Sequence, residues 1–170
     1  MKRCYLIFLL FLFCFSLSFG QSADYSEDVK TKESVVQALY EVISGAPEQK
    51  RDWERFLNLF LPESRLIPTG KNKQGEFTIR SISPEEYVQM FTNNIKGGFF
   101  EKELHHEVEE YGTIAHIFST YETRESVNGS INNRGINSIQ LYNDGNRYYI
   151  VNIFWCAESM GFTLPIKYLK

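Results

Sequence analysis

The chain has 170 residues, of which 43% are hydrophobic and 15% aromatic, enough to bury the core of one globular domain. Its formal net charge is −3, from 18 basic and 21 acidic side chains. This acidic balance argues against nucleic acid and anionic membranes as partners, because both are recognised through a basic surface.

The first 20 residues have the pattern of a secretory signal peptide. Met1-Lys2-Arg3 is basic, an apolar run extends from Cys4 to Phe19, and Ser18 and Gly20 are small residues at a cleavage site before Gln21. The alternative is a retained membrane anchor, but the run is short for a span of about 20 residues. We expect cleavage, a secreted or periplasmic location, and no membrane contact afterwards.

The processed chain carries a stronger acidic excess. Without Lys2 and Arg3 it has 16 basic and 21 acidic side chains, a net charge of −5. Cys156 is then the remaining cysteine, so no intrachain disulfide is expected. We expect Cys156 to be a buried small apolar residue, not a nucleophile.

Two helices are predicted before residue 63. Residues 33–44 place their apolar side chains on one helical stripe, and Gly45 follows as a typical C-terminal residue. A second helix is expected to begin near Pro47 and to end at Pro62. Its apolar positions have the spacing i, i+3, i+4 and i+7, at Trp53, Phe56, Leu57 and Phe60.

A third helix is predicted from its start signal. Ser83 is the expected N-cap, Pro84 the first helical residue and Glu86 the partner in a capping box, and Gly97-Gly98 ends the helix. Two short strands, at about residues 64–69 and 76–81, are expected before it.

From Phe99 onward the apolar period changes from helical to strand-like. Four strands are predicted, at about 99–109, 113–125, 131–143 and 147–158. Hairpin turns are expected near Tyr111-Gly112, Asn128-Gly129 and Asp144-Gly145. The prediction is an α+β fold, in which three N-terminal helices pack in the concave face of a curved, mainly antiparallel sheet that ends in this four-stranded meander.

The order of elements and two short motifs carry a resemblance to a known family. Asn146-Arg147-Tyr148-Tyr149-Ile150 is similar to the Gly-Arg-Trp-x-Ile pattern after the last hairpin, and Gly112-Thr113-Ile114-Ala115 is similar to Gly-x-Ala with one extra residue. With these motifs, residues 33–158 resemble the nuclear transport factor 2-like superfamily, which includes SnoaL-type cyclases, ketosteroid isomerases and scytalone dehydratase. The resemblance implies a cystatin-like cone and no particular activity.

The predicted domain limits follow from these patterns. Residues 1–20 are the signal peptide, residues 21–32 a flexible lead-in, residues 33–160 the nuclear transport factor 2-like domain and residues 161–170 a C-terminal tail.

The closing hairpin predicts which side chains share a face. A two-residue Asp144-Gly145 turn places Asn137 opposite Asn152, with Ile139–Ile150 and Leu141–Tyr148 on the same face. We expect this face to look into the cone. The remaining positions then form an apolar outer stripe, at Ile136, Gln140, Tyr149, Val151, Ile153 and Trp155, and the resemblance implies a homodimer through it.

The expected cone interior is mostly apolar with a few polar groups, the general form of a ligand site. In the first hairpin of the meander, Glu101 and Glu103 fall in the outward-facing polar set. The candidate ligand-binding residues are Tyr40, Trp53, Tyr87, His106, Ser119, Tyr121, Asn137, Asn152 and Phe154.

Each polar candidate has a functional and a structural interpretation. His106 is either an acid or base, or a half-buried histidine bonded to a neighbour. Asn137 and Asn152 either orient a ligand or bond to each other across the strands. The Tyr121 hydroxyl either polarises a carbonyl group or belongs to a tyrosine that only packs.

Motifs for metals and cofactors are weak or missing from the sequence. His105, Glu107 and His116 share the face opposite the pocket, where a solvated charged strand is expected and no metal. The sequence contains no P-loop, dinucleotide fingerprint, Gly-x-Ser-x-Gly, Cys-x-x-Cys or His-Glu-x-x-His pattern, so no cofactor is expected.

Three hypotheses for the function remain. The first is an exported module that binds a small, largely apolar molecule in its cone. The second is a cofactor-free isomerase, dehydratase or cyclase, with His106 as the acid or base and Tyr121 or Asn137 polarising a carbonyl. The third is a dimeric interaction protein without a ligand. The residues favour binding over catalysis.

Overall fold

The computed structural model describes residues 24–170; the predicted signal peptide, residues 1–20, lies outside this part. The helices are α1 (Lys32–Ile43), α2 (Trp53–Asn58) and α3 (Pro84–Asn94), with short 3₁₀ helices η1 (Glu27–Val29), η2 (Glu158–Met160) and η3 (Ile166–Tyr168). The strands are β1 (Phe60–Lys71), β2 (Phe77–Ile79), β3 (Phe100–Tyr111), β4 (Ile114–Arg124), β5 (Asn133–Asn143) and β6 (Tyr148–Ala157).

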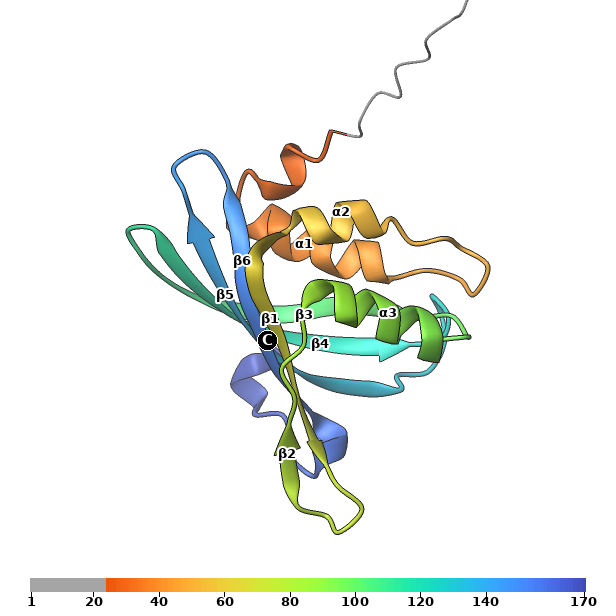
Figure 1. The fold of residues 1–170 in the computed structure, drawn as a ribbon. Coiled ribbons are helices and arrows are strands. Elements are labelled where there is room, and N and C mark those ends of the chain that lie inside the picture. Colours follow the sequence, from red (N-terminus) through yellow and green to blue (C-terminus); the bar gives the residue numbers. More distant parts are fainter. Residues whose placement is uncertain (1–23) are drawn as a thin grey trace, which may run out of the picture.

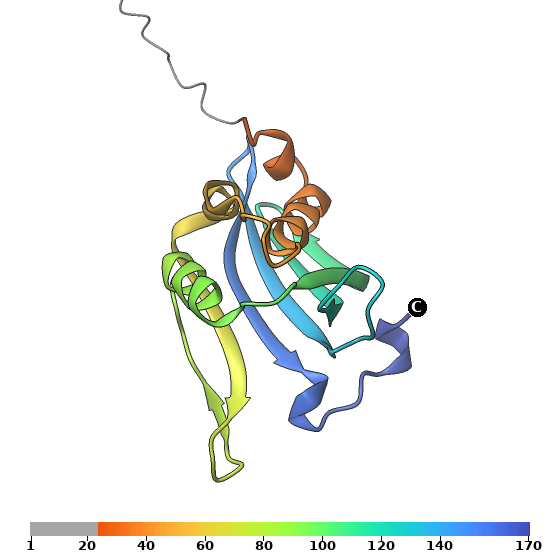
Figure 2. The same cartoon turned by 90° about the vertical axis from the view of Figure 1, so that its right-hand side faces the viewer.

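The strands form one curved, open sheet in the order β2-β1-β6-β5-β4-β3, in which β1 runs parallel to β6 and the other pairs are antiparallel. The three α-helices lie together over one side of this sheet, and the β1–β2 hairpin extends beyond it (Figure 1; Figure 2). The core lies between the helices and the concave face, where Val35, Phe56 and Ile139 have no solvent exposure. The predicted α+β cone is confirmed.

Local sequence signals fix the ends of the longer helices. Ser83 caps α3 through a capping box with Glu86, and Pro84 is the first helical residue, as predicted. Thr31 caps α1 in the same way with Ser34.

None of the helices within residues 24–170 has the length and apolar composition needed to span a membrane.

The second predicted helix was wrong in both limits. Asp52 caps α2, which ends at Asn58, and Pro62 lies inside β1. The register between β1 and β6 shifts between Phe60 and Arg65. A proline, which has no N–H to donate, is tolerated at such an irregularity.

The closing hairpin differs from the prediction in its turn. The turn contains four residues, because Asn143 pairs with Tyr148, and the Asp144 carboxylate accepts hydrogen bonds from the amides of Asn146 and Arg147. Gly145 still has a positive φ of 97°. Lengthening the turn by two residues leaves the predicted faces unchanged near the turn.

A β-bulge at Val151 then exchanges the faces of the rest of β6. Leu141 pairs with Ile150, whereas Gln140 pairs with Asn152, so Val151 is an extra residue. Beyond the bulge Asn137 is opposite Trp155. The predicted Asn137–Asn152 pair was therefore wrong.

A second bulge, at Leu104 in β3, has a comparable effect. His106 pairs with Ser119, and the two lie on the same concave face, as predicted, but Glu103 pairs with Tyr121 and Glu101 with Thr123. These two glutamates, assigned to the outer face from the sequence, therefore lie on the concave face. Alternation of polar and apolar residues does not reveal such an inserted residue.

Both ends of the described chain contact the domain. In the predicted lead-in, Val29 is buried and Asp28 forms an ion pair with Arg55 at 2.7 Å. In the predicted tail, Leu164 is buried and the ring of Tyr168 lies 5.1 Å from that of Phe118.

Candidate functional site

The concave side encloses an inner cavity of about 240 Å³, lined mainly by apolar side chains. Five aromatic residues line it: Phe56, Tyr87, Phe99, Tyr121 and Trp155. They come from α2, α3, the segment before β3, and strands β4 and β6. The cavity also contains four polar side chains from the sheet, Glu101, Thr123, Asn133 and Asn137.

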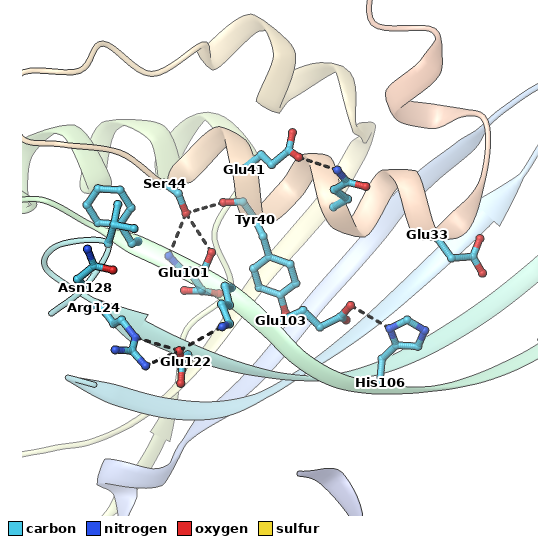
Figure 3. A pocket seen from close by; sticks show the side chains of 14 residues that line it. Glu33, Tyr40, Glu41, Ser44, Glu101, Glu103, His106, Glu122, Arg124 and Asn128 are labelled. Carbon is cyan, nitrogen blue, oxygen red and sulfur yellow. Dashed lines mark hydrogen bonds and ion pairs between the residues drawn. The ribbon is translucent and has the colours of Figure 1, made fainter. Parts of the chain in front are cut away.

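A larger groove of about 810 Å³ lies between α1 and the β3–β4 edge of the sheet (Figure 3). Its side chains are mostly polar and bonded to one another. Gln37 donates to Glu41 at 2.7 Å, and Arg124 pairs with Glu122 at 2.9 Å. Most of its hydrogen-bonding groups therefore already have partners within the protein.

Glu101 lines both the cavity and the groove. Ser44, which follows α1, fixes the backbone here: the Glu101 amide donates to Ser44 Oγ at 2.9 Å, and that hydroxyl lies 3.0 Å from the Glu101 carbonyl oxygen. The adjoining bridge between Gly45 and Phe99 holds the start of β3 against the end of α1. The bulge at Leu104 and these contacts together place the carboxyl group.

Burial raises the pKa of Glu101 from its ordinary value of 4.5 to about 7, and the hydrogen bond from Asn137 opposes this effect. Burial also raises the pKa of the Tyr40, Tyr87 and Tyr121 hydroxyls, and the nearby Glu101 charge adds to each shift. These phenols therefore stay protonated at neutral pH.

A chain of hydrogen bonds crosses the core beside Glu101. Ser119 donates to Glu103 Oε1 at 2.5 Å and lies 2.7 Å from the Tyr40 hydroxyl. Because the serine proton goes to Glu103, Tyr40 donates to Ser119. Asn137 Nδ2 in turn donates to Tyr40 at 3.0 Å and, over 3.4 Å, to Glu101.

The other end of the chain is His106, whose Nδ1 lies 2.9 Å from Glu103 Oε2 (Figure 3). The histidine is partly exposed in the groove. Its Nε2 makes no hydrogen bond with the described residues. His106 thus has an orienting carboxylate and a second nitrogen without a protein partner.

Two tyrosines that line the inner cavity, Tyr87 and Tyr121, have hydroxyl groups without a hydrogen bond to any residue of the described part. Tyr121 is only 5% exposed. Its ring crosses over Gly135, where a Cβ atom would lie 2.6 Å from the Tyr121 hydroxyl. Glycine at this position leaves the space that Tyr121 occupies.

The structure divides the predicted site residues into several groups. Tyr87 and Tyr121 line the cavity, His106 lines the groove, and Trp53 packs on Phe56 and Phe91 behind the cavity wall. Three others bond mainly to the protein itself: Tyr40, Ser119 and Asn137.

Two predicted pocket residues were wrong because of the bulge at Val151. Asn152 bonds to Gln140 on the outer face, and Phe154 is 43% exposed there. The same bulge corrects the predicted dimer stripe, since Ile153 is buried in the core and Trp155 lines the cavity.

The rest of the predicted stripe stays on the outer face, namely Ile136, Gln140, Tyr149 and Val151. The C-terminal tail covers part of this face, through residues 162–165 near Ile136 and Phe154. On the same face His105 contacts Glu107, and His116 contacts Ser138. Within the described residues no three His, Cys, Asp or Glu side chains come together as metal ligands.

Sequence reasoning missed Glu101, Phe56, Phe99 and Trp155 as cavity residues. For Glu101 and Trp155 no signal was present, because a bulge decided the face of each. Phe56 was recognised as an apolar helical position, but its place beside a cavity depends on how the helices pack.

The chain has no match among protein-family models, and no curated protein matches it in sequence. Solved structures do match. A Nostoc punctiforme protein of unknown function with a cystatin-like fold is 13% identical, with a TM-score of 0.57, over 79% of this chain and 91% of that one.

Two further structures are similar at the same level. LinA is 8% identical with a TM-score of 0.54, over 72% of this chain and 80% of that one. The association domain of C. elegans CaMKII is 18% identical with a TM-score of 0.51, over 71% and 88%. At these identities the likeness establishes the fold alone: the protein has the cystatin-like cone that its resemblance to nuclear transport factor 2-like proteins implies.

Proposed function

We propose that the protein binds a small, largely apolar molecule in its inner cavity. One observation carries this proposal. Five aromatic side chains line the cavity, and two of them, Tyr87 and Tyr121, have hydroxyl groups without a hydrogen-bond partner among the described residues. Mostly apolar walls with a few convergent polar groups are typical of ligand sites. A volume of about 240 Å³ limits the ligand to roughly the size of a substituted single ring.

Trp155 provides a reporter for this binding. Replacing Trp53, which lies outside the cavity, by Phe leaves Trp155 as the single tryptophan. Titration of Trp53→Phe with toluene and cyclohexanone is expected to shift the Trp155 emission and to raise the melting temperature, because a ligand that binds only the folded state stabilises it.

A blocking variant makes the test specific. Thr123 lines the cavity and is partly exposed, so Thr123→Phe fills its mouth, whereas Thr123→Val keeps the volume. Binding should be lost in Thr123→Phe and kept in Thr123→Val. Unchanged emission and melting temperature across the compounds in the unblocked protein would contradict the proposal.

A second candidate is acid–base catalysis by His106 in the groove, a cofactor-free isomerase, dehydratase or cyclase activity. The specific observation is that Glu103 orients Nδ1 while Nε2 has no partner among the described residues. His106 lines the groove and Tyr121 lines the cavity, so this second proposal assigns no role to Tyr121.

Exchange of the α-protons of cyclohexanone for deuterium, followed by NMR, tests this activity. We expect exchange above the buffer rate that falls at least tenfold in His106→Asn. A rate equal to buffer, or a rate that His106→Asn leaves unchanged, would reject the enzyme.

We also propose export by cleavage after Gly20 and homodimerisation through the uncovered part of the outer face. The basic start and apolar run support export. Exposed Ile114 and the stacked rings of Tyr142 and Tyr149 support the dimer. Mass spectrometry of the protein from its own host tests the first, and light scattering of the processed protein tests the second.

A further inference from the structure

Among residues 24–170, Glu101 is the one residue that lines both the cavity and the groove, so it lies where the two meet. Within residues 24–170, no Lys, Arg or His lies within ion-pair distance of it. The neighbouring Lys102 also lines the groove, but its Nζ lies 3.9 Å from the Glu122 carboxylate. A partly buried carboxylate without a cation is unusual, because burying a charge costs free energy unless a partner offsets it.

The walls around this carboxylate are aromatic. Phe56 and Tyr87 stack with their centroids 5.4 Å apart, and Phe99, Tyr121 and Trp155 complete the lining. The faces of such rings carry partial negative charge and attract cations, most strongly where water is excluded. None of the described residues that line the cavity is basic.

The Tyr121 hydroxyl gives an independent indication of a polar ligand group. Tyr121 is 5% exposed and lines the cavity, and its hydroxyl oxygen has no hydrogen-bond partner among the described residues. Within the described part, the fully buried side-chain atom without a partner is the Thr120 hydroxyl, so the Tyr121 oxygen is accessible to a ligand. An N–H group beside Glu101 would donate a hydrogen bond to it.

The groove in front of Glu101 is also acidic. Of its described lining residues, five are glutamates and two are cations, Lys102 and Arg124, which both lie beside Glu122. On the α1 side, Glu33 and Glu41 also pair with Lys32 and Arg55. Carboxylates along an entrance concentrate cations near it.

We propose that the ligand of the inner cavity is an organic ammonium ion, whose cationic nitrogen lies against Glu101 and the aromatic rings while its apolar part fills the cavity. This inference rests on the proposed function, since it specifies the chemistry of the molecule that the cavity binds. The direction of the Glu101 pKa agrees with it, because a bound cation would offset the burial that raises this pKa.

Two matched pairs of compounds test the charge while holding size nearly constant: choline against 3,3-dimethylbutan-1-ol, and benzylamine against benzyl alcohol. Calorimetric titration at pH 8 should show the cation of at least one pair binding about tenfold more tightly than its alcohol. In Glu101→Gln the preference should fall to near unity while the alcohol still binds. Glu33→Gln, an exposed groove carboxylate, is the control and should keep the preference.

A pH series on the wild-type protein makes the test independent of any variant. The preference for the cation should decrease as the pH falls from 8 to 5.5, because Glu101 takes up a proton near pH 7. Equal binding within both pairs, or a preference that survives in Glu101→Gln, overturns the inference. If toluene and the alcohols bind without a preference for cations, this inference alone fails, whereas if none of the compounds binds, the proposed function fails with it.

Discussion

The inner cavity and the outer groove share one carboxyl group but differ in how their polar atoms are used. In the groove, Gln37 bonds to Glu41 and Arg124 to Glu122. In the cavity, the Tyr87 and Tyr121 hydroxyls have no partner among the described residues. Hydrogen bonds already formed within a protein hold its structure, whereas an unbonded polar atom in a hollow is available to a ligand. The smaller hollow is therefore the better ligand site.

The largest expected loss of stability comes from a substitution in the cavity wall. Gly135→Ala places a Cβ atom 2.5 Å from the Cys156 carbonyl oxygen and 2.6 Å from the Tyr121 hydroxyl. We expect a loss of about 2–3 kcal/mol in the free energy of unfolding, because backbone and ring must both move. Gly97→Ala, with no atom within 4 Å, should change it by less than about 0.5 kcal/mol. Urea unfolding measures both, and equal effects would contradict the packing of Tyr121 over Gly135.

Adjacent buried residues of β4 sharpen the comparison between bonded and unbonded polar atoms. Ser119 and Thr120 are both 0% exposed, but Ser119 bonds to Tyr40 and Glu103, whereas the Thr120 hydroxyl lacks a partner. Ser119→Ala should cost about 1–3 kcal/mol because it leaves buried partners unsatisfied.

The companion variant is Thr120→Val, which is expected to be neutral or stabilising, since it removes an unbonded hydroxyl and keeps the shape. Thermal unfolding of the two variants side by side provides the measurement. If Thr120→Val were less stable than Ser119→Ala, the assignment of Ser119 as bonded and Thr120 as unbonded would be contradicted.

Stability against pH tests the shared carboxyl group. The folded protein keeps a proton on Glu101 up to about pH 7, whereas the unfolded chain releases it near 4.5. Between these values the folded state binds more protons, so the contribution of Glu101 to stability falls as the pH rises. Glu101→Gln should therefore exceed the wild type by about 3 kcal/mol at pH 8 and match it below pH 4.5. If the difference in stability between Glu101→Gln and the wild type were the same at every pH in this range, Glu101 would be exposed to solvent.

The smallest effect is expected in the groove. Gln37 is exposed and bonds to Glu41 on the surface of α1, so Gln37→Ala should change the free energy of unfolding by less than about 0.5 kcal/mol. Ligand binding in the inner cavity should stay the same within error. A large effect on binding would indicate that the ligand binds in the groove and not in the cavity.

Much of the fold was predictable from the sequence because its signals are local. The capping box at Ser83 and the alternation from residue 99 onward give α3 and the four long strands within a few residues. The site was less predictable because two single-residue bulges, at Leu104 and Val151, decide which side chains enter the cone. A bulge depends on tertiary packing and leaves the pattern of residue types unchanged.

The consequence is visible in particular residues. Tyr87 and Tyr121 were assigned to the interior correctly, because neither depends on a bulge in its own element. Phe154 was predicted inside the cone and Trp155 outside it, and the structure has the reverse, since both lie beyond the bulge at Val151. Glu101, the residue on which the proposed ligand chemistry depends, lies before Leu104 and was placed on the wrong face.

The most direct test of the central claim, that Glu101 lies in the cavity and not on the outer face, is the titration of its side-chain carboxyl carbon by NMR. We expect a midpoint near pH 7, where burial places the pKa, and a lower midpoint when a cationic ligand is bound. A midpoint near the ordinary value of 4.5, unchanged by any ligand, would contradict it.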